Sequence, residues 1–129
     1  MKSHLNWIKR MLGTEGDDSS AEENAGMLVR MAADGDDLQS RRDIDFHHLF
    51  SHEADALAFI AAVNEQGYNR CDHDYWVERL AWLTTVQVPM LPALEDITAT
   101  ELALNEIAQS FNGRSDGWGC MEVSSKPIS

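Results

Sequence analysis

The chain has 129 residues and a formal net charge of −12 at pH 7. This length suits one domain, and 43% hydrophobic residues supply enough apolar surface for one core. The negative charge disfavours direct nucleic-acid binding, and the longest apolar run, residues 56–63, is too short for a stable membrane span.

The two cysteines, Cys71 and Cys120, lie far apart and form no CxxC pair. A zinc knuckle or a dithiol redox motif is therefore not predicted. Residues 1–12 hold three of the ten basic side chains and none of the 22 acidic ones, and no secretory cleavage site follows them. We therefore expect a cytoplasmic protein in a reducing compartment, without a cofactor.

Three parts are predicted along the chain. Residues 1–20 combine a basic amphipathic segment with a linker at residues 13–20, which are polar and rich in turn formers. Residues 21–123 form the folded domain, and residues 124–129 form a polar tail. We expect the amphipathic segment to pack on its own domain or to be disordered, because one short segment associates only weakly with membranes.

The first half of the domain is predicted to contain a helix, a strand and a second helix. A serine cap at residues 19–20 begins the first helix, which ends at Gly35. Residues 41–50 alternate in polarity with a period of two, which predicts a strand. Ser51 then caps the second helix, and Gly67 ends it.

A hairpin is predicted next. A short extended piece at residues 68–72 leads through a turn at residues 72–74 into a strand at residues 75–88. Pro89 and Pro92 close this strand, because proline cannot donate a hydrogen bond to a neighbouring strand.

The domain is predicted to end with a helix and a strand. Thr98 and Glu101 have the spacing of a capping box, and the helix that they begin ends at Phe111. Residues 117–123 form the last strand. After the first helix the order is strand, helix, strand, strand, helix, strand. This order predicts an α+β ferredoxin-like βαββαβ antiparallel sheet with helices on one face, preceded by an extra N-terminal helix.

In this arrangement the first and third strands are central. Cys71 on the second strand and Cys120 on the fourth then lie at opposite edges of the sheet. A disulfide needs Cα atoms within about 7 Å of each other, so we expect no disulfide.

A histidine cluster near the first strand suggests a metal site as one hypothesis. His47, His48 and His52, with His73 and Asp45 in addition, offer the imidazole and carboxylate ligands that zinc or iron accepts. On a strand, however, His47 and His48 point to opposite faces. We expect no metal site, and a small metal-dependent hydrolase using His47, His48 and His52 stays as an alternative.

Acidic residues gather around the start of the first strand. They lack the calcium-loop pattern, since no glutamate closes a twelve-residue loop. We expect them to form a patch that docks an arginine-rich segment of another protein, with a merely solvated face as the alternative. The residues of this predicted patch are Asp34, Asp36, Asp37, Asp43 and Asp45, with Glu22 and Glu23 nearby in sequence.

The last strand contains an unusual Asp-Gly-Trp-Gly stretch at residues 116–119. Glycines on both sides of Trp118 predict a backbone that turns sharply or is approached closely, with the indole packed as an anchor. The alternative is that Trp118 is an exposed interface anchor. Asp116 and Trp118 complete the predicted partner-binding set.

This stretch, after a helix ending in Ala108 and Phe111, resembles the signature of the regulator of ribonuclease E activity B family, the ribonuclease E inhibitors. The resemblance runs from about Ala21 to Val123. It implies a cytoplasmic, non-enzymatic, ferredoxin-like domain that binds the scaffold portion of ribonuclease E and lowers RNA cleavage. Further matches, in order, are Asp34-Gly35-Asp36-Asp37 before Arg42, Phe46-His47-His48, Gln66-Gly67-Tyr68, and Val88-Pro89 leading to Ile97-Thr98-Ala99.

We therefore interpret the chain as a non-enzymatic, protein-binding regulator of RNA degradation. Its expected partner is ribonuclease E or another protein with an arginine-rich segment, and we expect a monomer or a weak homo-oligomer. The alternatives are the hydrolase described above and a ligand-sensing dimerisation module.

Overall fold

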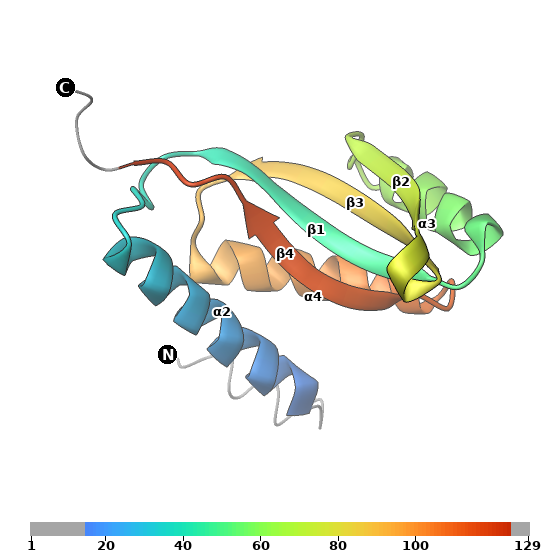
Figure 1. Cartoon of the computed structure of the whole chain (residues 1–129), viewed down its shortest axis with the longest axis horizontal. Coiled ribbons are helices and arrows are strands. Elements are labelled where there is room, and N and C mark those ends of the chain that lie inside the picture. The colour runs from blue at the N-terminus through green and yellow to red at the C-terminus, as the bar shows by residue number, and fades with distance from the viewer. Residues whose placement is uncertain (1–14, 125–129) are drawn as a thin grey trace.

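The computed structural model describes residues 15–124, with side chains from Ala21 onward. The basic amphipathic segment predicted for residues 1–12 and most of the predicted polar tail lie outside the described residues. The described part forms the helices and strands shown in Figure 1. In chain order they are α2 (Glu15–Ala33), β1 (Arg42–Phe50), α3 (Glu53–Glu65), β2 (Cys71–Trp76), the 3-10 turn η1 (Val77–Arg79), β3 (Ala81–Met90), α4 (Leu94–Gln109) and β4 (Arg114–Cys120).

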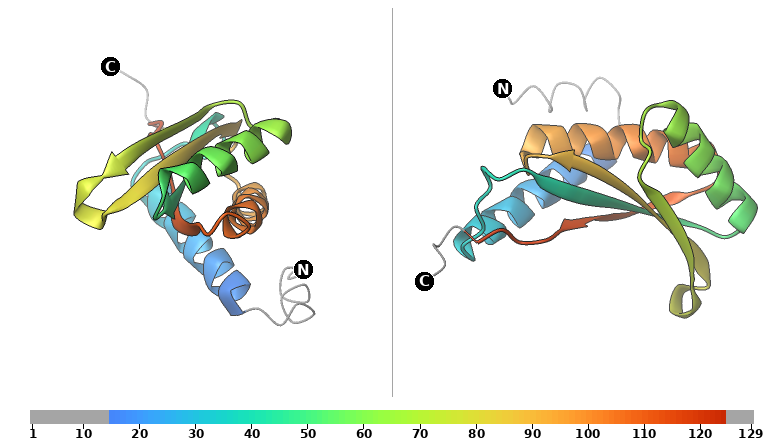
Figure 2. Two further views of the ribbon diagram at one scale, coloured as in Figure 1. Left: turned by 90° about the vertical axis from the view of Figure 1, so that its right-hand side faces the viewer. Right: turned by 90° about the horizontal axis from the view of Figure 1, so that it is seen from above.

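The four strands form one antiparallel sheet in the order β2-β3-β1-β4. The predicted α+β class, the order of elements and the central position of the first and third strands are confirmed. α3 and α4 cover the same face of the sheet, and no described helix covers the other face (Figure 2). α2 packs against α4. Cys71 and Cys120 are free thiols on the two opposite edge strands.

Alternation along β1 builds the core between the sheet and the helices. Ile44, Phe46 and Phe50 are at most 1% exposed, as a period of two with one buried face predicts. The Phe50 ring centroid lies 5.1 Å from that of Phe59 on α3. Each large side chain of this kind stabilises the fold by about 1.5–3 kcal/mol when fully buried. Other core residues are Val63, Val86, Ile97, Leu104, Ala108 and Trp118.

The first two helices begin at positions that the sequence patterns did not predict. α2 begins at Glu15. The prediction of a linker at residues 13–20 is therefore wrong from Glu15 onward, and the prediction of a serine cap at residues 19–20 is also wrong. This stretch lacks proline, and its acidic residues favour the first turn of a helix. α3 begins at Glu53 with His52 rather than Ser51 in the N-cap position, and no side chain caps it.

α4 begins at Leu94, with Ala93 at its N-cap, so the predicted capping box is wrong. Thr98 and Glu101 instead lie inside the helix, where they are 1% and 7% exposed. Residues three apart share one face of a helix, so a buried polar pair has the same spacing as a capping box.

The hairpin turn lies after β2 and not at residues 72–74, so that prediction is wrong. The chain reverses through η1 and Leu80, which adopts left-handed backbone angles with φ of 50°. Leucine rarely adopts this conformation, so Leu80 gives no signal of a turn in the sequence. Asp72 and Asp74 lie on β2 itself and pair with β3.

Pro89 does not close β3, which continues to Met90. The backbone N–H of Gln87 donates to the carbonyl oxygen of Arg70 at 2.8 Å, and β2 pairs with β3 only as far as Val86. The nitrogen of Pro89 points to the same side as that of Gln87, beyond the end of β2. A missing donor is tolerated there because this part of β3 has a free edge.

β4 begins and ends three residues earlier than predicted and contains a β-bulge. Between the pairs Phe46–Trp118 and His48–Ser115, one residue of β1 faces two residues of β4. Gly117 lies in this bulge with φ of 88°, a left-handed conformation that glycine adopts without strain. The predicted sharp turn of the backbone beside Trp118 is therefore confirmed at Gly117.

Candidate functional site

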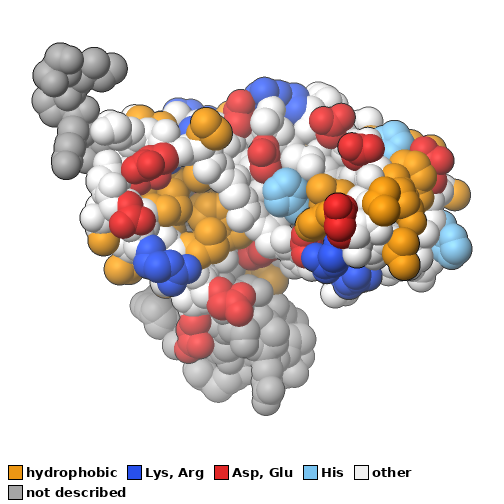
Figure 3. Space-filling view, viewed as in Figure 1, with side chains coloured by type: hydrophobic (Ala, Val, Ile, Leu, Met, Phe, Trp, Pro, Cys, Tyr) orange, Lys and Arg blue, Asp and Glu red, His pale blue; other side chains and the backbone are white. Residues whose placement is uncertain are grey.

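The open face of the sheet carries carboxylates from three strands. β1 contributes Asp43 and Asp45, which alternate with the inward-facing core residues. β2 contributes Asp72 and Asp74, and the bulge of β4 contributes Asp116. Acidic side chains are spread over this face in Figure 3. The result is an acidic surface on the side of the sheet that faces away from α3 and α4.

Two arginines neutralise part of this charge. Arg70 Nη1 lies 2.9 Å from Asp43 Oδ1, and Arg79 Nη1 lies 3.6 Å from Asp116 Oδ1. The Arg70 pair is 56% and 39% exposed, so water and salt screen it and a partner can replace the arginine at little cost. The carboxylates of this face with no cationic partner within residues 15–124 are Asp45, Asp72 and Asp74.

An apolar tip stands beside the acidic face, at the turn of the β2–β3 hairpin. Val77 is 66% exposed, Leu80 is 73% exposed and Tyr75 is 41% exposed. The Arg79 guanidinium lies 5.1 Å from the centre of the Trp76 ring, a cation–π contact that orders this tip. Exposed apolar side chains gathered beside charged ones are typical of protein-binding surfaces.

The three histidines of the hydrolase hypothesis do not converge. His47 hydrogen-bonds to Thr85 Oγ1 at 3.2 Å on the open face, and His52 is exposed before α3. His48 is 1% exposed on the opposite face, where its Nε2–H donates to Asn105 Oδ1 at 2.7 Å. Burial lowers the pKa of His48 and so favours its neutral form. Within residues 15–124 no three histidine, cysteine or acidic side chains are grouped as a metal site requires.

Asp36, one of the predicted partner-binding residues, is 6% exposed and lies in a buried ion pair. Arg42 Nη1 is 2.8 Å from Asp36 Oδ1, and the same guanidinium donates to the carbonyl oxygens of Asp37, at 2.6 Å, and Met121, at 3.1 Å. The ion pair between Asp36 and Arg42 therefore connects the loop after α2 with β1 and with the chain after β4.

Two other residues of the predicted patch lie on either side of Asp36. Asp34 is exposed at the end of α2, and no cation pairs with it in the described part of the chain. Asp37 Oδ1 accepts a hydrogen bond from the backbone N–H of Gln39 at 3.0 Å, which closes a local turn. The predicted acidic patch is thus divided between this loop and the open sheet face.

Trp118 is 7% exposed and packs as an anchor in the core. Its indole N–H donates to Asn24 Oδ1 at 2.8 Å. Asn24 Nδ2 in turn donates to Thr98 Oγ1 and to Glu101 Oε1, both at 3.1 Å. This buried network joins α2, α4 and β4. Burial raises the pKa of Glu101, and the hydrogen bond from Asn24 opposes that rise.

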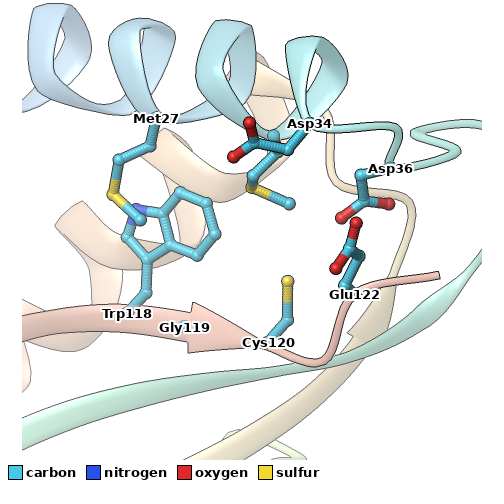
Figure 4. Close-up of a pocket in the computed structure, with 8 residues that line it drawn as sticks. Met27, Asp34, Asp36, Trp118, Gly119, Cys120 and Glu122 are labelled. Carbon is cyan, nitrogen blue, oxygen red and sulfur yellow. The ribbon is translucent and has the colours of Figure 1, made fainter. Parts of the chain in front are cut away.

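A pocket of about 230 Å³ lies between α2 and β4 (Figure 4). Its apolar walls come from Met27 and Met31 on α2 and from Trp118 and Cys120 on β4. Burial raises the pKa of the Cys120 thiol, which keeps it protonated. Acidic side chains lie at one end of the pocket in Figure 4, and they are Asp34, Asp36 and Glu122.

No pattern in the sequence pairs Met27 and Met31 with Trp118, because these residues are about ninety positions apart. The only local signal is their spacing of four, which places two methionines on one face of α2. Asp72 and Asp74 were likewise missed as surface carboxylates, because three polar residues in a row also favour a turn.

A search of the curated proteins found no match. Among the described residues, no helix is both long enough and apolar enough to cross a membrane. Residues 21–120 match the family model described as "Regulator of ribonuclease activity B", which confirms the resemblance inferred from the sequence motifs. The chain therefore belongs to this family, whose members are non-enzymatic protein inhibitors of ribonuclease E that modulate RNA degradation.

Proposed function

We propose that this chain inhibits ribonuclease E by docking the open face of its sheet on an arginine-rich segment of that enzyme. The observation that carries the proposal is the row of carboxylates on this face, three of which have no cationic partner among the described residues. Arginine binds carboxylates through two parallel hydrogen bonds, so it suits such a face better than lysine does. The long-range field of a chain with net charge −12 also speeds the encounter with a cationic partner.

Inhibition follows from the same charge. RNA binds proteins largely through its phosphates, which need arginine or lysine partners. A domain that covers an arginine-rich segment removes those cations from RNA and holds negative charge in their place. No catalytic group is needed, so the domain lowers RNA cleavage by occupancy alone.

The predicted partner-binding residues take two kinds of role in this proposal. Asp43, Asp45 and Asp116 contact the partner directly from the open face, and Asp34 and Asp37 extend the surface at the end of α2. Asp36 and Trp118 support it indirectly, because one lies in a buried ion pair and the other in the core. The exposed hairpin tip at Val77 and Leu80 adds apolar contact beside the charges.

The test measures the affinity of the full chain for ribonuclease E at two salt concentrations. The triple variant Asp45→Asn, Asp72→Asn, Asp74→Asn removes the three unpaired charges and keeps each side chain's shape. Exposed pairs contribute about 0.5 kcal/mol each, so Kd should rise about tenfold.

A matched control removes three exposed charges from α3 and α4, through Glu95→Gln, Glu65→Gln and Glu106→Gln. This control should bind like the wild type, and higher salt should weaken the wild type more than the open-face variant. Equal affinity of the open-face variant and the control would show that the open face is not the docking surface.

We also propose that the sheet has the ferredoxin-like arrangement. Its strand order, its antiparallel pairing and its two helices on one face support this assignment. An experimental structure in which β1 and β3 are not neighbours would contradict it.

We further propose that the chain acts as a cytoplasmic monomer. A location in the cytoplasm is supported by the family's action on an RNA-degrading enzyme, and a monomer is supported by the charge of the open face, which disfavours self-association through that face. Analytical ultracentrifugation checks the monomer, since a mass that rises with concentration would support the dimerisation alternative.

A further inference from the structure

The pocket between α2 and β4 has an apolar part and an acidic part. Met27 and Trp118 lie side by side at one end of it, and the carboxylates of Asp34 and Glu122 lie toward the other (Figure 4). We propose that this pocket receives one arginine side chain of the partner, an inference that rests on the proposed binding to ribonuclease E.

The size of the pocket limits its occupant. Pockets for free small-molecule ligands usually enclose about 300–1,000 Å³. This pocket, at about 230 Å³, is smaller and is open to the surface, so it suits one long side chain better than a metabolite.

The chemistry of the walls selects arginine. An arginine buries its methylene stem along apolar surface while its charged head reaches polar groups. Here the stem lies against the Met27 and Met31 thioethers, and the guanidinium reaches Asp34 and Glu122. Neither carboxylate has a cationic partner within the described residues, whereas Asp36 is already paired with Arg42.

Lysine fits the same pocket less well. Its ammonium holds water more strongly and presents no planar fork to two carboxylates. The guanidinium is planar and less strongly hydrated, so it leaves water at lower cost and can donate two parallel hydrogen bonds to a carboxylate.

The pocket is held open before a partner arrives. Asn24, Met27 and Met31 lie on one face of α2. The hydrogen bond from the Trp118 indole N–H to Asn24 Oδ1 holds this face beside β4, and the hydrogen bonds from Asn24 to Thr98 and Glu101 hold it against α4. The Arg42–Asp36 ion pair fixes the end of the helix. A preformed site loses less conformational entropy on binding, which favours affinity.

The first arm of the test uses the full chain and ribonuclease E. The double variant Asp34→Asn, Glu122→Gln should raise Kd about tenfold, because two charge-assisted contacts are weakened. Both residues are exposed, so the variant should fold normally. The matched control Glu65→Gln, Glu106→Gln removes two exposed charges elsewhere and should leave Kd within about twofold of the wild-type value.

The second arm uses small probes and needs no ribonuclease E. N-ethylguanidinium should shift the NMR signals of the Met27 and Met31 methyl groups, and n-butylammonium at the same concentration should shift them less. The Asp34→Asn, Glu122→Gln variant should lose the guanidinium response.

The two arms separate failure of the pocket from failure of the proposed function. If the wild type does not bind ribonuclease E but its methyl signals respond to N-ethylguanidinium, the proposed partner is wrong. The inference that the pocket prefers a guanidinium to an ammonium group is then still supported. If the pocket variant binds like its control while the open-face variant is weakened, the pocket inference is overturned alone. If Lys9→Gln, Arg10→Gln shifts the two methyl signals without any probe, the chain's own amino-terminal segment is the occupant and the inference is also overturned.

Discussion

Replacing Asn24 with alanine should destabilise the domain by about 2–4 kcal/mol. Asn24 is 3% exposed and forms buried hydrogen bonds with Trp118, Thr98 and Glu101. Without it the Trp118 N–H is buried with no acceptor, which costs about 1–3 kcal/mol, and each of the other two bonds contributes about 0.5–1.5 kcal/mol. Together these contributions amount to about 2–6 kcal/mol. Protonation of Glu101, whose pKa burial already raises, recovers part of this loss, so we expect about 2–4 kcal/mol. Small domains have only about 5–15 kcal/mol in total, so the effect is large.

Urea denaturation, followed by circular dichroism, measures this change, and a double-mutant cycle isolates the bond to the indole. Trp118→Phe removes the donor, so adding Asn24→Ala to it should cost less than Asn24→Ala alone. We expect a coupling energy of about 1–2 kcal/mol. Asn69→Ala, on an exposed loop, is the control and should change stability by less than about 0.5 kcal/mol. Additive effects of the two substitutions, within about 0.5 kcal/mol, would refute the network as the link between α2 and β4.

Three further changes test other parts of the structure by the same denaturation assay. Asp36→Ala should cost about 3–5 kcal/mol, because it leaves the buried Arg42 guanidinium unpaired, and a loss below about 1 kcal/mol would contradict the ion pair's role. Glu101→Gln should stabilise the domain at pH 7, because burial raises the pKa of Glu101 and disfavours its charged form. The folded wild type takes up a proton at Glu101 as the pH falls through this raised pKa, so the stability advantage of the Glu101→Gln variant should shrink and vanish below about pH 4.5. A stability advantage that stays constant with pH would show that the charge of Glu101 is not its cause. Gly117→Ala should cost about 1–2 kcal/mol because φ is 88°, while Gly119→Ala should cost less, since Gly119 has no positive φ and an added Cβ meets nothing within 4 Å at either position. Equal losses at the two glycines would contradict the bulge.

The sheet could be predicted from the sequence because its signals are local and repeated. The alternation over Ile44 to Phe50 correctly placed His47 and His48 on opposite faces, and this period of two is by itself an argument against the hydrolase. The order of strands and helices then led to the observed sheet order through the general rules for crossover connections.

The errors arose where one local pattern fits two structures. Thr98 and Glu101 fit a capping box and also one face of a helix, and only contact with Asn24, more than seventy residues away, decides between them. The reversal at Leu80 depends on a backbone conformation that leucine seldom adopts.

The candidate site was predicted only in part for the same reason. Asp43 and Asp45 were identified from their charge and Asp116 from the Asp-Gly-Trp-Gly stretch, and the structure places all three on the open face. Asp36 looked equivalent to Asp34 in the sequence. Arg42 follows Asp36 closely along the chain, but this spacing does not show that the two side chains form a buried ion pair. The pocket depends on packing between α2 and β4, which no local pattern encodes.

The rate of RNA cleavage by ribonuclease E, measured against the concentration of the purified chain, tests the central claim most directly. Cleavage should slow to a plateau with the concentration dependence of binding, and the Asp45→Asn, Asp72→Asn, Asp74→Asn variant should need about ten times more protein for the same effect. The helix control Glu95→Gln, Glu65→Gln, Glu106→Gln should inhibit like the wild type. Equal inhibition by the open-face variant and this control at every salt concentration would contradict an account based on the charge of the open sheet face.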